Sequence, residues 1–205
     1  MHDSLLPGQK AAGENAYVRF LQASLNTGSL DIYINGCLML HNFHYKMTST
    51  YVPLTRGIHQ IDLYQTGERI KPILSEKVTI EQYHFYTLAV VGAVKKLQLL
   101  PFLCQPKVPA GESKIRFLHL AAEAPVLDIA VKDRDVVFPD LGFKHATNYL
   151  GLTPMTVDLE ARTAGGKEVV LPLPKMKFLA GYTYSIALIG SVSLTPSLEA
   201  IVLID

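Results

Sequence analysis

The sequence has no tryptophan, only two cysteines and almost no excess of charge. Its 205 residues include 19 basic and 18 acidic side chains, which give a formal net charge of +1. Non-specific binding of nucleic acid needs a basic stripe that displaces counterions, and the longest basic run here is Lys95-Lys96. We therefore expect no nucleic-acid partner.

Long hydrophobic runs are also missing. Stretches such as Leu88 to Val94 fall far short of the roughly 20 residues that span a bilayer, so we expect no membrane span. Residues 1–14 are polar and irregular, which predicts a flexible arm, and they lack the basic start and apolar run of a signal peptide. The sequence by itself thus indicates a cytoplasmic protein.

The most informative feature that is present is an internal repeat. Val18-Arg19-Phe20-Leu21 and Leu30-Asp31-Ile32 recur 97 positions later as Ile115-Arg116-Phe117-Leu118 and Leu127-Asp128-Ile129. Further echoes at offsets of 96 to 98 pair Lys46 and Tyr51 with Lys144 and Tyr149, Asp62-Leu63 with Asp158-Leu159, and residues 86–92 with 184–190. A period of this size is that of a small domain.

The repeat predicts two domains. We place the first domain at residues 15–105, a semi-rigid linker with two prolines at 106–112, and the second domain at 113–205. Cys37 and Cys104 both fall in the first domain, and the repeat offset puts Arg134 and Ile201 at their places in the second. A disulfide between them stays open, but two free thiols are favoured for a cytosolic chain.

Both halves contain short segments in which apolar and polar residues alternate, separated by turn residues such as Asn35-Gly36, and this pattern is typical of β-strands. No window of 12 residues has helical periodicity. Expected strands lie near 17–23, 29–34, 49–54, 58–65, 74–80, 83–91, 97–103, 114–120, 126–132, 147–152, 155–162, 168–173, 182–189 and 198–204. Seven short strands in each half predict an all-β fold of two tandem β-sandwich domains.

Tyr86 and Tyr184 stand at the start of a late strand in each copy. A tyrosine there whose hydroxyl bonds back to nearby backbone is the corner of immunoglobulin-like sandwiches. The alternative is that both are core aromatics.

Arg19 and Asp31 are 12 residues apart, and so are Arg116 and Asp128. Each lies between apolar neighbours, so each should point away from the core. If the two strands are adjacent, they form a duplicated cross-strand ion pair. A charged recognition face is the alternative, but a repeated pair suits a requirement of the fold.

Histidine and nucleophile patterns give no reaction. His119 occupies the place of Gln22, so we expect it to satisfy a backbone group at the edge of the core. His41 and His44 have a spacing that could share zinc only with further ligands, which the sequence does not supply. There is no G-x-S-x-G elbow and no phosphate-binding glycine loop, so we expect no catalytic residue, metal or cofactor.

The sequence also resembles a known family. Several segments are similar to the bacterial domain of unknown function 4397, which often occurs in tandem. These segments are residues 16–24 with 30–36, residues 115–120 with 124–131, and residues 182–190. The resemblance covers about residues 15 to 205. The family motif has a histidine where the first copy has Gln22, and a Ser-Pro-Asp-Ala-Pro loop from which both copies depart, the second at Ala121-Ala122-Glu123.

The resemblance implies an immunoglobulin- or transthyretin-like sandwich without an established enzymatic activity, usually on exported or envelope-associated bacterial proteins. Similar tandem proteins occur in spore formers, so the resemblance makes association with a spore or cell surface the alternative to a cytoplasmic location. We therefore expect a non-catalytic structural or protein-interaction module that contacts an envelope or coat protein, or itself, through edge strands. The alternative is a small-ligand or glycan-binding protein. Sugar-binding sites in β-sandwiches usually use exposed aromatic side chains as platforms. The candidates here are Tyr45, Tyr51, Tyr64 and Tyr149.

Overall fold

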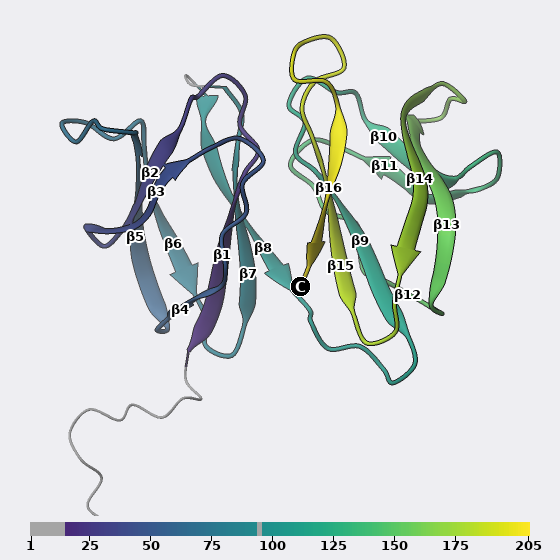
Figure 1. Cartoon of the computed structure of the whole chain (residues 1–205), viewed down its shortest axis with the longest axis horizontal. Helices are drawn as coiled ribbons and strands as arrows, with labels where there is room; N and C mark the ends of the chain where they lie inside the picture. The colour runs from purple at the N-terminus through teal and green to yellow at the C-terminus, as the bar shows by residue number, and fades with distance from the viewer. Residues whose placement is uncertain (1–14, 94–95) are drawn as a thin grey trace, which may run out of the picture.

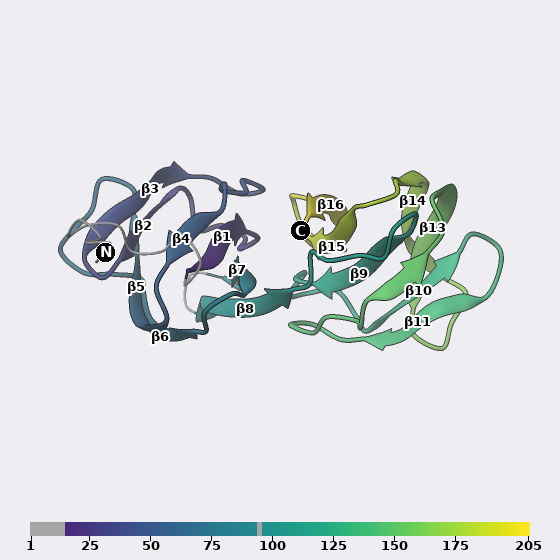
Figure 2. The same cartoon turned by 90° about the horizontal axis from the view of Figure 1, so that it is seen from below.

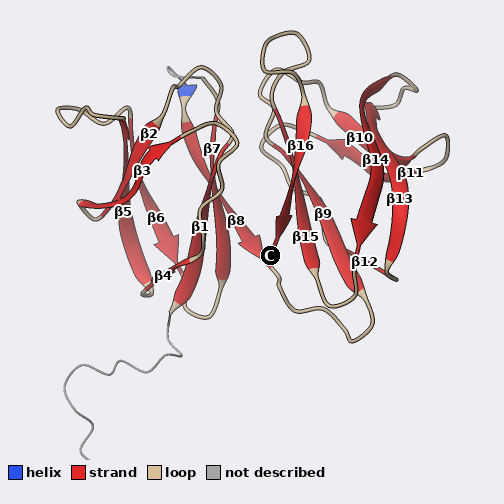
Figure 3. Ribbon diagram, viewed as in Figure 1, coloured by secondary structure: helices blue, strands red, loops and turns tan. Residues whose placement is uncertain are grey.

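The computed structural model describes residues 15–93 and 96–205, so the expected arm at residues 1–14 lies outside the described residues. The described part contains strands and turns but no α-helix, and the short blue segment in Figure 3 is a 3₁₀ turn at Lys96. It forms two β-sandwiches of eight strands each, side by side along the long axis of the molecule (Figure 1). The all-β prediction and the prediction of two sandwiches are confirmed.

The first sandwich has two four-stranded sheets, in the orders β4-β1-β7-β8 and β3-β2-β5-β6. Strand β1 pairs parallel with β7, whereas its other neighbour and all pairs in the second sheet are antiparallel. The strands are β1 (Ala16–Gln22), β2 (Leu30–Ile34), β3 (Cys37–Phe43), β4 (Val52–Leu54), β5 (Gly57–Gln65), β6 (Leu74–Ile80), β7 (Phe85–Val91) and β8 (Gln98–Cys104).

The second sandwich repeats this arrangement in the sheets β12-β9-β15-β16 and β11-β10-β13-β14. Strand β9 again pairs parallel with β15. The strands are β9 (Ser113–His119), β10 (Leu127–Val131), β11 (Val136–Leu141), β12 (Leu150–Leu152), β13 (Met155–Thr163), β14 (Val169–Phe178), β15 (Thr183–Ile189) and β16 (Glu199–Ile204).

The structure corrects one register of the repeat. Ile34 pairs with Ile61 in the first sandwich, and Val131 pairs with Leu159 in the second, so Leu159 is the counterpart of Ile61. The echo between Asp62-Leu63 and Asp158-Leu159 is therefore displaced by two residues. A shift of two keeps every side chain on its own face of the strand, which is why the alternation could not reveal it.

Strands β3 and β11 were not among the expected strands. Both are edge strands with mostly exposed side chains, and each contains a bulge next to a residue with positive φ, Asn42 at 56° and Asp140 at 54°. Bulges and exposure remove the alternation on which the strand prediction depends. Strand β14 also runs to Phe178, five residues past the expected end at 173.

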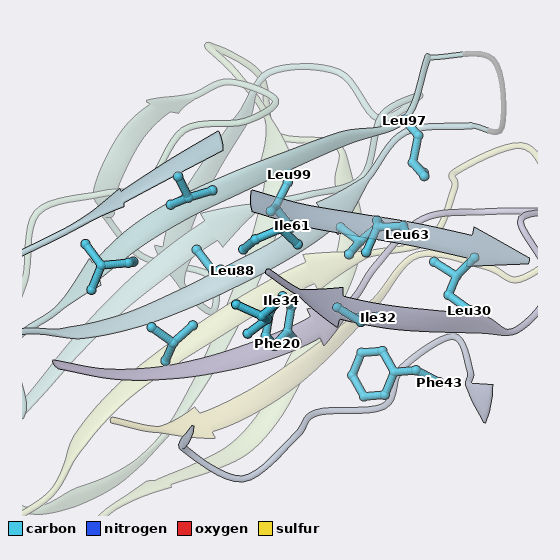
Figure 4. Close-up of a cluster of buried hydrophobic side chains, with 14 of the residues drawn as sticks. Phe20, Leu30, Ile32, Ile34, Phe43, Ile61, Leu63, Leu88, Leu97 and Leu99 are labelled. Carbon is cyan, nitrogen blue, oxygen red and sulfur yellow. The ribbon is translucent and has the colours of Figure 1, made fainter. Parts of the chain in front are cut away.

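Each sandwich has its own apolar core between its two sheets. In the first, Phe20, Ile32, Ile61 and Leu88 are completely buried and point toward one another (Figure 4). The second core is built around Phe117, which is equally buried. Strand alternation turns one face of every strand inward, and two such faces bury enough apolar surface to hold each half together.

A third apolar cluster lies between the sandwiches. The β1 sheet of the first sandwich, called here the first inner sheet, faces the β9 sheet of the second, called the second inner sheet (Figures 1 and 2). Both inner sheets are therefore covered on both faces, which explains the continuous burial of β1, β7, β9 and β15.

Candidate functional site

The contact between the two inner sheets holds the two arginines that the repeat duplicates. Its apolar part consists of equivalent residues from the two halves. From the first sandwich come Leu21, Ala23, Ala89, Val91 and Phe102, and from the second Leu118, Leu120, Ala187, Ile189 and Leu203.

Arg19 leaves β1 on the side away from its own core and crosses to the second sandwich. Its Nε donates to the Thr87 hydroxyl at 2.8 Å within the first inner sheet. Its two terminal nitrogens donate to the carbonyl oxygen of Ile204 at 2.6 Å and to Oδ1 of Asp205 at 2.5 Å. The guanidinium is stacked over the Tyr51 ring, with 4.9 Å between its central carbon and the ring centroid.

Arg116 makes the same contacts in the opposite direction. Its Nε donates to the Ser185 hydroxyl at 2.8 Å, and one terminal nitrogen donates to the carbonyl oxygen of Leu103 at 2.7 Å. The other lies 3.4 Å from the sulfur of Cys104, and the Tyr149 ring centroid is 4.5 Å away. The two arginines thus form a reciprocal clamp, each fixing the last strand of the other sandwich.

The clamp has one acidic group. Asp205 has a completely buried side chain, and its Oδ2 accepts hydrogen bonds from the hydroxyls of Tyr149 at 2.5 Å and Ser185 at 2.7 Å. Burial, followed by the charge of Asp205, raises the pKa of Tyr149 above its ordinary value. The second sandwich thus holds this carboxylate in place with its own hydroxyls, while Oδ1 faces Arg19.

Cys104 is the counterpart of Asp205 in the first sandwich. The repeat offset had instead matched Cys104 with Ile201. The offset changes here because the β15–β16 connection (residues 190–198) is three residues longer than the β7–β8 connection (residues 92–97). Burial raises the pKa of the Cys104 thiol, and the nearby Tyr51 hydroxyl is buried without a hydrogen-bond partner. Both cysteines are free, Cys37 being exposed and Cys104 buried.

The predicted pairing of Arg19 with Asp31, and of Arg116 with Asp128, is wrong. Strands β1 and β2 belong to opposite sheets, and so do β9 and β10, so the side chains that leave the core from these strands diverge. The arginines enter the contact between the sandwiches, and the aspartates lie on the outer sheets.

Asp31 and Asp128 stabilise the backbone of the outer sheets. Asp31 accepts the N–H groups of Asn42 at 2.8 Å and Gly67 at 3.3 Å. Asp128 accepts the equivalent groups, from Asp140 at 2.8 Å and Gly165 at 2.9 Å. Each carboxylate thus joins a bulge to a hairpin turn.

The pKa of Asp31 reflects this position. Burial raises it, but the two backbone donors, the Thr66 hydroxyl and the charge of His41 together outweigh burial and lower the pKa below 3.8.

The two candidate corner tyrosines make the same contact in both copies. The hydroxyl of Tyr86 accepts a hydrogen bond from the N–H of Glu81 at 3.3 Å, and that of Tyr184 accepts one from Leu179 at 3.1 Å. Each bond ties the start of a strand to the segment five residues before it. This is the geometry that the corner interpretation requires.

His119 is completely buried at the end of β9, and its Nε2 lies 2.9 Å from the carbonyl oxygen of Pro125. Its Nδ1 has no hydrogen-bond partner. Burial is the main cause that lowers the pKa of His119 below 6.5. In the first copy, Gln22 also supports the loop that follows it, by donating to the Thr27 hydroxyl at 3.1 Å.

The remaining candidates are dispersed. His41 lies on β3 and reaches Asp31 at 2.9 Å, whereas His44 lies just beyond the end of that strand. Within residues 15–93 and 96–205, no group of three His, Cys, Asp or Glu side chains is placed to hold a metal. In the same residues no helix is long and apolar enough to cross a membrane.

The four tyrosines suggested as sugar platforms are half-buried. Tyr51 and Tyr149 stack on the arginines, Tyr45 joins the cluster between the sandwiches, and Tyr64 contacts Tyr33 edge to face with 5.2 Å between ring centroids.

The second sandwich has an apolar groove between its edge strands β11 and β12. Its volume is about 100 Å³, and its floor includes Ile129 and Phe178 while Leu150 and Met155 are partly exposed at its mouth. Every lining side chain is apolar.

At the equivalent place the first sandwich has a buried histidine. His59 is the counterpart of Val157, which lines the groove. Its ring bridges the turns on either side, at 3.0 Å from Nδ2 of Asn35 and 2.8 Å from the carbonyl oxygen of Thr55. The two halves thus differ in the side chain at this position.

The fold and these contacts define a protein of two β-sandwiches docked face to face. The sequence model of the family described as domain of unknown function DUF4397 matches residues 16–130, more than half of the chain. The chain therefore belongs to this family. The matched segment contains all of the first sandwich and the first two strands of the second, up to Ala130.

Two solved structures align over most of the chain. The Bacillus anthracis TIE protein aligns with a TM-score of 0.26 and 9% identity, over 86% of this chain and 34% of that one. This chain therefore spans about a third of that protein. A structure described as alpha-glucan binding by a streptococcal virulence factor aligns with a TM-score of 0.26 and 12% identity, over 84% of this chain and 93% of that one. A comparison with curated proteins gave no significant match.

Sequence reasoning missed Asp205 and the whole contact between the sandwiches. The only available signal was the alternation of β1 and β9, where Arg19 and Leu21, or Arg116 and Leu118, share the face opposite the core. Apolar residues on both faces of a strand predict that both faces are covered.

The low pKa of His119 predicts how stability depends on pH. In the unfolded chain the imidazole takes up a proton near pH 6.5, but the folded site resists it, so the free energy of unfolding should fall as the pH drops below 6.5. The variant His119→Gln, which copies Gln22, should lose this part of the dependence. Chemical denaturation at pH 7.5 and 5.5 checks it, and an unchanged difference in the variant would contradict the assignment.

Arg116 meets the neutral Cys104 where Arg19 meets Asp205, and its carboxylate contact is the longer one to Oδ2 of Asp205 in its own sandwich, at 4.0 Å, which gives a second prediction. Cys104→Asp supplies a carboxylate to Arg116 and an acceptor to the Tyr51 hydroxyl, and hydrogen bonds to charged groups contribute about 1.5–3 kcal/mol each before the cost of burial. We expect Cys104→Asp to be more stable than its neutral isostere Cys104→Asn by about 1 kcal/mol in denaturant unfolding. An aspartate variant less stable than the asparagine variant would contradict the equivalence of residues 104 and 205.

Proposed function

We propose that the protein is a non-catalytic structural and protein-interaction module built from tandem copies of the family's domain. Both halves share sheet order, the parallel pair of β1 with β7 or β9 with β15, and the arginine, aspartate and tyrosine contacts. This shared architecture supports assigning the second sandwich to the same domain type as the first.

The observation that carries the proposal is how the duplicated polar residues are used. The arginines join the sandwiches, the aspartates hold bulges and turns, and the tyrosine hydroxyls hold strand starts. These arginine, aspartate and tyrosine side chains are thus used to hold the fold together. A fixed shape with outward-facing edges suits a scaffold.

The outer sheets offer the surfaces for a partner. Strands β3, β6, β11 and β14 each pair on one side only, so their other sides present backbone groups. An extended segment of an envelope or coat protein can add to such an edge, with main-chain hydrogen bonds supplying affinity.

Localisation and capture test this function together. A fluorescent fusion should concentrate at the cell or spore surface during growth or sporulation, and a tagged chain should capture a surface protein from the native cell. A diffuse signal at every stage, together with no captured partner, would contradict the proposal.

A second candidate function is the binding of a small apolar ligand, which the groove favours. The groove offers no polar group to orient a sugar, so an aliphatic or aromatic hydrocarbon fits it better than a glycan. The volume of about 100 Å³ suits a group of the size of a short alkyl chain or a single ring.

Closing the groove tests the second candidate. Val157→His introduces the histidine that the first sandwich has at this place, and it should abolish the rise in Tm that a panel of short alkyl and aryl alcohols gives the unmodified protein. Thr156→His, on the neighbouring exposed residue, should keep that rise. Absence of any rise in the unmodified protein, or its survival in Val157→His, would contradict the groove as a ligand site.

A further inference from the structure

The contact between the inner sheets has the form of a dimer interface made within one chain. Arg19 reaches the carbonyl oxygen of Ile204, and Arg116 reaches the equivalent carbonyl oxygen of Leu103, at 2.6 and 2.7 Å. A contact in which equivalent groups exchange roles is isologous, as in twofold homodimers. The apolar residues follow the same rule, because every member from one half has its counterpart from the other.

The charged residues of the contact do not follow this symmetry. Two ion pairs cross the contact, Arg19 with Asp205 at 2.5 Å and Lys46 with Glu199 at 2.6 Å. Both acids belong to the second sandwich and both bases to the first.

The second sandwich also carries the bases. Arg116 and Lys144 are the counterparts of Arg19 and Lys46, whereas the counterparts of the two acids are the neutral residues Cys104 and Gln98. The second inner sheet thus has base and acid at both places, and the first inner sheet has only the bases.

We propose that the second inner sheet is a self-complementary association face whose partner is the second sandwich of another copy of this chain. In that pairing, Arg116 of each copy takes the role of Arg19 and meets Asp205 of the other copy. Lys144 takes the role of Lys46 and meets Glu199. Two ion pairs of each kind form across that contact, the same number that two separate chains hold within themselves.

The groups that hold the acid belong to its own sandwich and do not depend on the partner. Tyr149 and Ser185 of the same sandwich hold Oδ2 of Asp205, so Oδ1 is already directed at the position of an incoming guanidinium. Preorganisation of this kind reduces the ordering cost of association.

The apolar residues also permit the exchange. The second inner sheet has larger side chains than the first at two places, Leu120 for Ala23 and Ile189 for Val91. It has a smaller side chain at a third place, Leu203 for Phe102. The second sheet thus gains four side-chain carbons and loses three, and cores tolerate apolar exchanges whose net change in size is small.

The first inner sheet lacks this property. Pairing two copies of it would bury two arginines opposite Cys104, with no carboxylate between them, and a buried charge without a partner is strongly unfavourable. The charge pattern therefore permits pairing of the first sheet with the second and of the second with itself, but not of the first with itself. This goes beyond the proposed function, which uses the outer sheets.

Matched substitutions at equivalent alanines test the proposal in the full chain. Ala89 and Ala187 are both completely buried in the contact, on β7 and β15. Ala89→Lys undocks the first sandwich and leaves the second inner sheet intact, so the mass from light scattering at high protein concentration should double. Ala187→Lys damages the second sheet itself, so the chain should stay monomeric.

A third variant identifies the face. Adding Arg116→Ala to Ala89→Lys should return the chain to a monomer, because the pairing then lacks its clamp. Monomers for both lysine variants, dimers for both, or a dimer that survives Arg116→Ala would overturn the proposal.

A milder pair decides the question if a lysine variant does not fold. Arg19→Ala releases Asp205 from its partner within the chain, whereas Arg116→Ala removes the base needed between copies. Sedimentation should show at least tenfold tighter self-association for Arg19→Ala than for Arg116→Ala. Equal self-association of the two variants would overturn the proposal.

Discussion

The ion pair between Arg19 and Asp205 is the interaction on which the arrangement of this molecule depends. It joins the first strand of one sandwich to the last residue of the sequence, 186 residues away, and both side chains are buried. Buried charges are costly to desolvate, so such a pair contributes more to the choice of one geometry than to stability as such. Here it fixes how two independently cored sandwiches face each other, with the reciprocal bond of Arg116 as its counterpart.

The duplicated sequence explains why this arrangement is close to symmetric and where it departs from symmetry. Residues that serve each sandwich alone, such as Asp31 and Asp128, keep the same partners in both copies. At the contact some equivalent residues differ, and each half there needs to fit only the other. Cys104 and Asp205 show this most clearly: at equivalent places, one half has a neutral thiol and the other has the single buried carboxylate of the clamp.

Most of the fold could be predicted from the sequence because strand alternation and turn residues are local signals. The edge strands β3 and β11 escaped prediction, since bulges at Asn42 and Asp140 interrupt that alternation. The partner of Arg19 escaped for a different reason: the choice between Asp31 and Asp205 depends on which sheet each strand joins. Nothing local to Arg19 carries that information, and the three extra residues before β16 hid the equivalence of Asp205 and Cys104.

A double-mutant cycle tests the central claim most directly. The free energies of unfolding of the unmodified protein, Arg19→Ala, Asp205→Asn and the double variant give the coupling between the two side chains. A buried clamp between the sandwiches predicts a coupling of about 1–3 kcal/mol, because each single variant leaves the other charge or its hydrogen bonds unsatisfied. Effects that add to within about 0.5 kcal/mol would show that the two residues do not meet, and the account of how the sandwiches are joined would be wrong.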